Sequence, residues 1–183
     1  IEYKKTDLET NDKEKEVKGF QTMKPNELIE SSPEPPKAIV ENLLVEKGVT
    51  IISGTDGVGK TWFGLQMAVA IASGESILGW EVNQKPVLMI QFELSSAQLS
   101  SRLKKYDLDK TKCQLLFTVM KDEDLIFTDS WEKIAQTIAD NDFYNGVVII
   151  DNLYTSTNVN VSENSELKPL LKTINHIKNV SNN

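Results

Sequence analysis

Short apolar runs alternate with stretches of helical spacing along most of the chain. The apolar runs have the length of strands and are bounded by turn-forming or polar residues, at 49–53, 87–93, 114–120 and 147–151. Between and after them, apolar residues recur at helical spacing over 62–72, 95–106, 129–138 and 163–180. This repeated order of strand and helix predicts an α/β domain with a mostly parallel sheet.

Three of these segments refine that prediction. The stretch 62–72 is apolar on nearly every side, which is typical of a helix buried against a sheet. The run 147–150 is continuous and β-branched, which favours a parallel strand buried on both faces. Ser95 and Gln98 form a Ser-x-x-Gln capping box, so we expect a helix to begin there.

The first residues differ in composition from the rest. Residues 1–23 are mostly charged and polar with no sustained apolar period, and we interpret them as a flexible lead-in. Four prolines between 25 and 36 then mark a connector around a possible short helix at 26–30. The folded domain is therefore expected to occupy residues 24–183.

A phosphate-binding pattern lies at the centre of the chain. In VTIISGTDGVGKT, a predicted buried strand leads into G-x-x-x-x-G-K-[ST] and then into the first apolar helix. Glycines let backbone N–H groups converge on a phosphate, the lysine reaches the β- and γ-phosphates, and the threonine hydroxyl can bind Mg²⁺. A chance glycine-rich turn before Lys-Thr is the alternative. The predicted nucleotide contacts are Gly54, Thr55, Asp56, Gly57, Val58, Gly59, Lys60, Thr61 and Trp62.

Two carboxylates follow other predicted strands. Asp151 ends the run 147–151, where P-loop proteins place a second magnesium residue opposite Thr61. Asn152 follows it, so the adjacent position cannot supply a base for the attacking water. Glu93 closes the run 87–93 and is the best candidate base by position, because parallel strands bring their carboxyl ends to one edge. A solvated strand-end residue is the alternative for Glu93.

Composition excludes several classes of function. The net charge of −7 argues against nonspecific binding of a polyanion by this segment. One cysteine and one histidine leave neither an internal disulfide nor a Cys/His metal cluster. No apolar run approaches the roughly 20 residues of a membrane span, and a cytoplasmic setting is expected. Neither an N-K-x-D guanine motif nor an arginine-rich kinase lid is present, and Arg102 is the sole arginine.

The stretches GTDGVGKTWFGLQMAVAIASGESILGW, PVLMIQFELSSAQLSSRLKKY and VVIIDNL together resemble the RecA-fold ATPases of the RepA-like hexameric replicative helicase group. The resemblance runs from about residue 26 to residue 177. It implies a three-layer sandwich around a RecA-like P-loop NTPase sheet, with ATP and Mg²⁺ as cofactors. It also implies catalytic roles for Glu93, as the base, and for Lys60, with Thr61 and Asp151 holding the metal.

The family pattern continues beyond what this chain contains. Family members carry a further core strand with a polar sensor, later strands and an arginine finger supplied across a subunit interface. We therefore expect the sheet to lack its C-terminal strands and the run 49–53 to form an uncovered edge. The resemblance implies a homo-oligomeric, hexameric ring and single-stranded DNA bound through parts not in this chain. The sequence itself shows no aromatic and basic stacking track.

Two functions remain open at this stage. One is the ATP-hydrolysing core of a helicase or of a related DNA-replication or repair ATPase, with low activity for this segment alone. The other is a nucleotide-binding switch or assembly module with little turnover.

Overall fold

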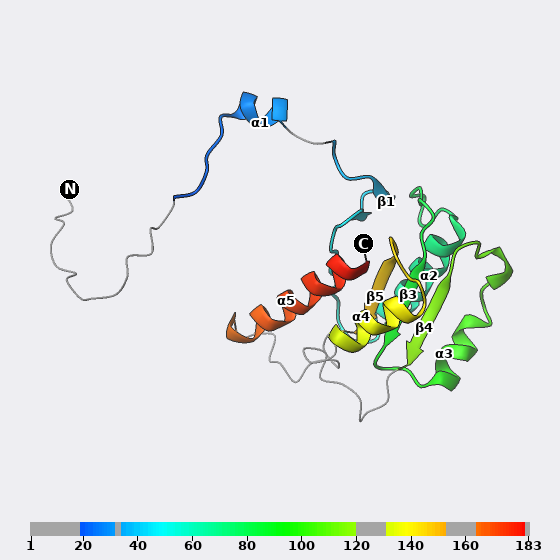
Figure 1. Cartoon of the computed structure of the whole chain (residues 1–183). Coiled ribbons are helices and arrows are strands. Elements are labelled where there is room, and N and C mark those ends of the chain that lie inside the picture. Colours follow the sequence, from blue (N-terminus) through cyan, green and yellow to red (C-terminus); the bar gives the residue numbers. More distant parts are fainter. Residues whose placement is uncertain (1–18, 32–33, 120–130, 153–163, 182–183) are drawn as a thin grey trace. The chain divides into compact units, whose positions relative to one another are not determined.

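The computed structural model describes residues 19–31, 34–119, 131–152 and 164–181, which form parts of two units. The first unit, Ile1–Pro35, carries α1 (Pro25–Ser31), which agrees with the predicted helix at 26–30 (Figure 1). The Glu27 carboxylate accepts a hydrogen bond from the Lys24 backbone N–H at 3.0 Å, at the start of this helix. The second unit, Pro36–Asn183, contains the sheet, whereas the predicted boundary at residue 24 stays a prediction.

Three parallel strands form the sheet of the second unit (Figure 1). The central strand is β3 (Val87–Gln91), flanked by β4 (Leu115–Val119) and β5 (Val147–Asp151). Every residue of β3 is buried, as expected for an apolar strand with a neighbour on each side. The register pairs Gln91 with Val119 and with Asp151, so the three strands end together. The predicted α/β class with a parallel sheet is confirmed.

Helices cover both faces of this sheet. On one face, α2 (Lys60–Ser73) packs its apolar residues against Val87 and Met89 of β3. On the other, α4 (Trp131–Asp140) and α5 (Asn164–Ser181) pack against Leu88 and Ile90. Alternate residues of one strand thus enter opposite cores, which follows from the two-residue period of a strand. The three-layer sandwich is confirmed.

Smaller elements add to the core on the α2 face of the sheet. After β3, α3 (Ser96–Leu103) begins with the predicted capping box, and the short 3-10 helix η1 (Leu108–Lys110) leads towards β4. Before α2, the antiparallel pair β1 (Ala38–Val40) and β2 (Leu44–Val45) buries Ile39 and Val40 in the α2 core. Among the described helices, none combines the length and apolarity needed to cross a membrane.

The predicted strand before the phosphate loop is wrong. Residues 49–53 form no strand, and Val49, Ile51 and Ile52 are 51%, 66% and 48% exposed. The physical reason is the lack of a neighbour, since within the described residues β5 pairs only with β3 and nothing pairs with 49–53. A β-branched run is stabilised as a strand by cross-strand packing and ladder hydrogen bonds, and neither is available to it here.

Candidate phosphate-binding and hydrolytic site

The direction of α2 brings the phosphate loop to the carboxyl edge of the sheet. Near the end of α2, the carbonyls of Ile71 and Ala72 accept hydrogen bonds from the backbone N–H groups of Lys85 and Cys113. These two donors lie just before β3 and β4, so the end of α2 sits where the strands begin. The helix is 14 residues long, about 21 Å, and therefore its first residue, Lys60, lies towards the ends of the strands.

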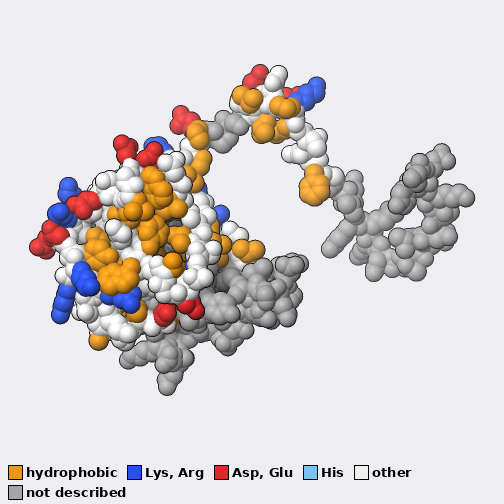
Figure 2. Space-filling view, turned by 180° about the vertical axis from the view of Figure 1, so that it is seen from behind, with side chains coloured by type: hydrophobic (Ala, Val, Ile, Leu, Met, Phe, Trp, Pro, Cys, Tyr) orange, Lys and Arg blue, Asp and Glu red, His pale blue; other side chains and the backbone are white. Residues whose placement is uncertain are grey.

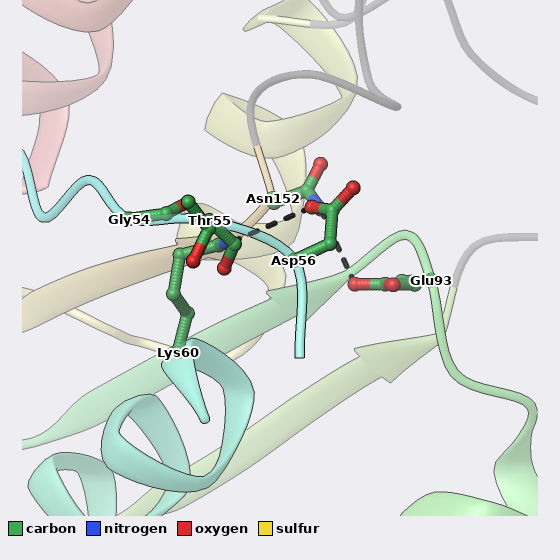
Figure 3. Close-up of polar contacts among 6 residues, drawn as sticks. All are labelled: Gly54, Thr55, Asp56, Lys60, Glu93 and Asn152. Atoms are coloured by element: carbon green, nitrogen blue, oxygen red, sulfur yellow. Dashed lines mark hydrogen bonds and ion pairs between the residues drawn. The ribbon is translucent and has the colours of Figure 1, made fainter. Parts of the chain in front are cut away.

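Lys60 is folded back onto the loop that precedes it. Its ammonium group donates hydrogen bonds to the carbonyl oxygens of Gly54 at 2.8 Å and Thr55 at 3.0 Å (Figure 3). The Asp56 carboxylate lies 3.7 Å away and is fully exposed, so this ion pair contributes little to stability. The loop thus surrounds the lysine with oxygen atoms, and a bound phosphate would compete with these carbonyls for the same ammonium group.

The glycines of the loop have a conformational role. Gly57 and Gly59 have φ values of +77° and +101°, in the left-handed region that other residues rarely adopt. A Cβ atom at either position would meet nothing within 4 Å, so backbone conformation rather than crowding requires glycine there. Gly59 also precedes α2 with no side chain capping the helix. The start of α2 therefore combines a positive dipole end with backbone donors, which suits an anion.

Asp151 is buried and held by a residue that the sequence analysis did not single out. Its carboxylate, 7% exposed, accepts a hydrogen bond of 2.8 Å from the side-chain amide nitrogen of Gln91. The oxygen of the same amide accepts from the backbone N–H groups of Glu93 and Leu94, at 2.8 and 3.3 Å. Gln91 is fully buried, and a lone polar residue in the apolar run VLMIQ was the signal that could have identified it.

Glu93 lies beside Asn152, the residue after the buried aspartate. The Asn152 amide nitrogen donates to the Glu93 carboxylate at 3.2 Å (Figure 3). In addition, the backbone N–H of Phe92 donates to the Asp151 carbonyl at 2.8 Å, which continues the pairing of β3 and β5 beyond Gln91. The two predicted carboxylates therefore lie at the ends of adjacent, hydrogen-bonded strands.

Trp62 makes contacts that the sequence analysis missed. The guanidinium of Arg102 and the ammonium of Lys105 lie 4.9 and 4.7 Å from the centre of its ring. Both cations come from α3 and the residues just after it, whereas Trp62 belongs to the first turn of α2. Figure 2 shows basic side chains lying directly beside hydrophobic ones on one face of the molecule. One aromatic and basic cluster is therefore present, although the sequence indicated no such track.

The residues at the edge fit a magnesium nucleotide. Within the described ranges, no group of three or more His, Cys, Asp or Glu side chains is arranged to hold a metal ion. Magnesium in nucleotide sites commonly takes one or two protein ligands and completes its shell with water and phosphate oxygens. One hydroxyl, from the half-buried Thr61, and one buried carboxylate, from Asp151, suit that pattern.

Comparison with known proteins agrees with this geometry. The family model AAA_25, described as an AAA domain, matches residues 14–181, nearly the whole chain. Comparison with curated proteins and with solved structures gives no match. With the phosphate loop, the parallel sheet and the matched family in agreement, the chain belongs to the AAA domain family and is the nucleotide-binding core of a P-loop ATPase.

Proposed function

We propose that this chain is the Mg²⁺-dependent ATP-binding and ATP-hydrolysing core of a RepA-like DNA helicase or of a related DNA-replication or repair ATPase. The observation that carries the proposal is the grouping of residues at one sheet edge. Asp151 ends β5 and Glu93 follows the end of β3, these strands are paired in register, and α2 directs Lys60 towards the same edge. Such an edge is where open α/β sheets bind their ligands.

Each residue has a distinct role in this proposal. Lys60 would exchange the carbonyls of Gly54 and Thr55 for the β- and γ-phosphates, and its charge would hold them. Thr61 and Asp151 would hold the metal, which neutralises charge on the phosphates when bound. Glu93 would accept a proton from the attacking water on its carboxylate, as a general base.

The proposed partners follow from the resemblance and not from contacts in the described structure. Single-stranded DNA and a hexameric ring of identical subunits are proposed, with turnover assisted across the subunit interface. The cluster of Trp62, Arg102 and Lys105 is the described feature closest in chemistry to a nucleic-acid contact. Arg102, the sole arginine of the sequence, lies on α3 and is therefore a poor candidate for an arginine finger.

A second function is supported by one observation. Lys60 is already satisfied by two carbonyls and paired with Asp56, as in a loop that changes its contacts when a nucleotide binds. A nucleotide-binding switch or assembly module with little turnover needs this exchange of contacts and no catalytic base, so it is the second candidate function.

Phosphate release from ATP, with Mg²⁺ and with or without single-stranded DNA, tests these alternatives. The motor proposal predicts slow turnover that rises with protein concentration and with DNA. ATP binding with no turnover under either condition would favour the switch. Brisk turnover that is independent of protein concentration would contradict assistance between subunits.

A further inference from the structure

The described structure joins the ends of β3 and β5 by two side-chain amides. Gln91 ends β3, and its amide nitrogen donates to Asp151 of β5 at 2.8 Å. Asn152 follows β5, and its amide nitrogen donates to Glu93, which follows β3, at 3.2 Å. Each strand end thus supplies one carboxylate, and an amide from the opposite strand end contacts it.

Gln91 does more than contact one carboxylate. Its amide oxygen accepts from the backbone N–H groups of Glu93 and Leu94, at 2.8 and 3.3 Å. A glutamine can donate from one end of its amide while it accepts at the other, whereas an ionised glutamate can only accept. An ionised carboxylate could not make both kinds of bond, so the directions observed require an uncharged side chain at this fully buried position.

Burial makes these hydrogen bonds consequential. Gln91 is 0% exposed and Asp151 is 7% exposed, so water cannot replace a bond that is lost. The amide engages one carboxylate oxygen of Asp151, Oδ2, and the hydrogen bonds of the described residues do not use the other oxygen, which could bind a metal ion. Hydrogen bonds to a metal-binding carboxylate orient it, and removing such a partner typically weakens metal binding by about 10- to 100-fold.

We propose that Gln91 is a positioning residue that orients Asp151 for Mg²⁺ and couples the metal site to the segment carrying Glu93. The inference rests on the proposed function, because it assumes that Asp151 holds the metal. Movement of the Asp151 carboxylate towards a bound ion would be transmitted through one rigid amide to the backbone of Glu93 and Leu94. Asn152 contacts Glu93 by a separate hydrogen bond.

The test is the gain in ATP affinity that Mg²⁺ provides, measured by titration calorimetry in Mg²⁺ and in EDTA. Gln91→Met keeps the length of the side chain and removes the amide, and Gln91→Leu removes the amide with a shorter, branched side chain. Both should reduce the Mg²⁺-dependent gain by about 10- to 100-fold and leave ATP affinity in EDTA near the wild-type value. Gln84→Met is the matched control, because that half-buried amide donates to Ala72 at the other end of α2.

Other outcomes are equally defined. A folded Gln91→Met or Gln91→Leu protein with the same Mg²⁺-dependent gain as Gln84→Met would overturn the inference. If neither Gln91 variant folds, the wild type decides by NMR. Mg²⁺ added to the ATP-bound wild type should shift the Gln91 side-chain amide and the Glu93 N–H resonances, and the absence of both shifts would overturn the inference.

Failure of the proposed function would be seen in the wild-type protein alone. In that case the wild-type protein would bind ATP no more tightly in Mg²⁺ than in EDTA. That result would remove Asp151 as a metal residue before any variant is compared.

Discussion

Two glycine-to-alanine substitutions should change stability in opposite directions. Gly146 immediately precedes β5, the strand that ends at Asp151. A Cβ atom there would lie 2.4 Å from the tip of the Phe143 ring and 2.9 Å from the Pro86 carbonyl oxygen. Phe143 is fully buried, and the same carbonyl accepts the first hydrogen bond of β5, from Val147, at 2.8 Å. Neither neighbour can move away without disturbing the core or the start of the strand.

Gly64 provides the matched control. It lies inside α2, where a Cβ atom would meet the flexible tip of Met89 at 3.5 Å and Ile149 at 4.0 Å. These are ordinary van der Waals separations, so the added methyl group fits. Alanine in place of glycine inside a helix gains roughly 0.5–1 kcal/mol.

The expected magnitudes follow from these contacts. Overpacking a buried site costs about 1–3 kcal/mol, so Gly146→Ala should unfold at a Tm lower by roughly 2–12 °C. Gly64→Ala should raise the Tm by up to about 4 °C. Calorimetric or circular-dichroism melting measures both. A Tm for Gly146→Ala equal to or above that of the wild type would refute the steric argument and the placement of Phe143 beneath this turn.

Three further predictions concern the site and the ion pair of Glu46, which follows β2. Glu93→Gln should keep Mg²⁺-ATP binding and lower turnover by roughly 10²- to 10⁴-fold, and unchanged phosphate release would remove Glu93 as the base. ATP should change the fluorescence of Trp62, which belongs to the first turn of α2, and the change should persist in Trp80→Phe and vanish in Trp62→Phe. The hydrogen bond and the charge of Lys85, 2.9 Å away, lower the pKa of the Glu46 carboxyl. The pair should therefore stabilise the fold at pH values above the ordinary carboxyl pKa. This stabilisation should be lost as the pH falls through the lowered pKa. Glu46→Gln should remove that part of the acid sensitivity in pH-dependent melting.

Most of the fold could be predicted because local patterns agreed with the tertiary structure. The continuous apolar run before Asp151 forms a parallel strand with α2 on one side and α4 and α5 on the other. Its central residues are half-buried rather than buried, because among the described strands β5 has a single neighbour. The capping box at Ser95 and Gln98 forms as its sequence predicts, because both of its hydrogen bonds are local. Local chemistry of this kind depends little on the rest of the chain.

The failed prediction and the missed contacts share a different cause. The run 49–53 has strand composition, yet a strand also needs a neighbour, and sequence composition does not say whether one is present. The bonds from Gln91 to Asp151 and from Asn152 to Glu93 join residues 60 and 59 positions apart. No periodicity reveals such pairs, because only the register of β3 with β5 brings them together.

The cluster at Trp62 was missed for a similar reason. The sequence places Trp62 at the start of a predicted buried helix, among the nucleotide contacts, whereas Arg102 and Lys105 belong to another predicted helix. Their contact depends on how α2 and α3 are arranged around the carboxyl edge of the sheet. Cation and ring distances of 4.9 and 4.7 Å could only come from the structure.

The most direct test of the central claim is ATP binding to the wild type and to Lys60→Ala, measured by titration calorimetry in Mg²⁺. The account predicts saturable binding with one site per chain in the wild type. It also predicts an affinity at least about 10-fold lower in Lys60→Ala, because a charge-assisted hydrogen bond to phosphate contributes roughly 1.5–3 kcal/mol. Lys112→Ala, an exposed lysine outside the loop, is the control and should match the wild type. Equal ATP affinity in all three proteins would contradict the phosphate-binding role of this loop.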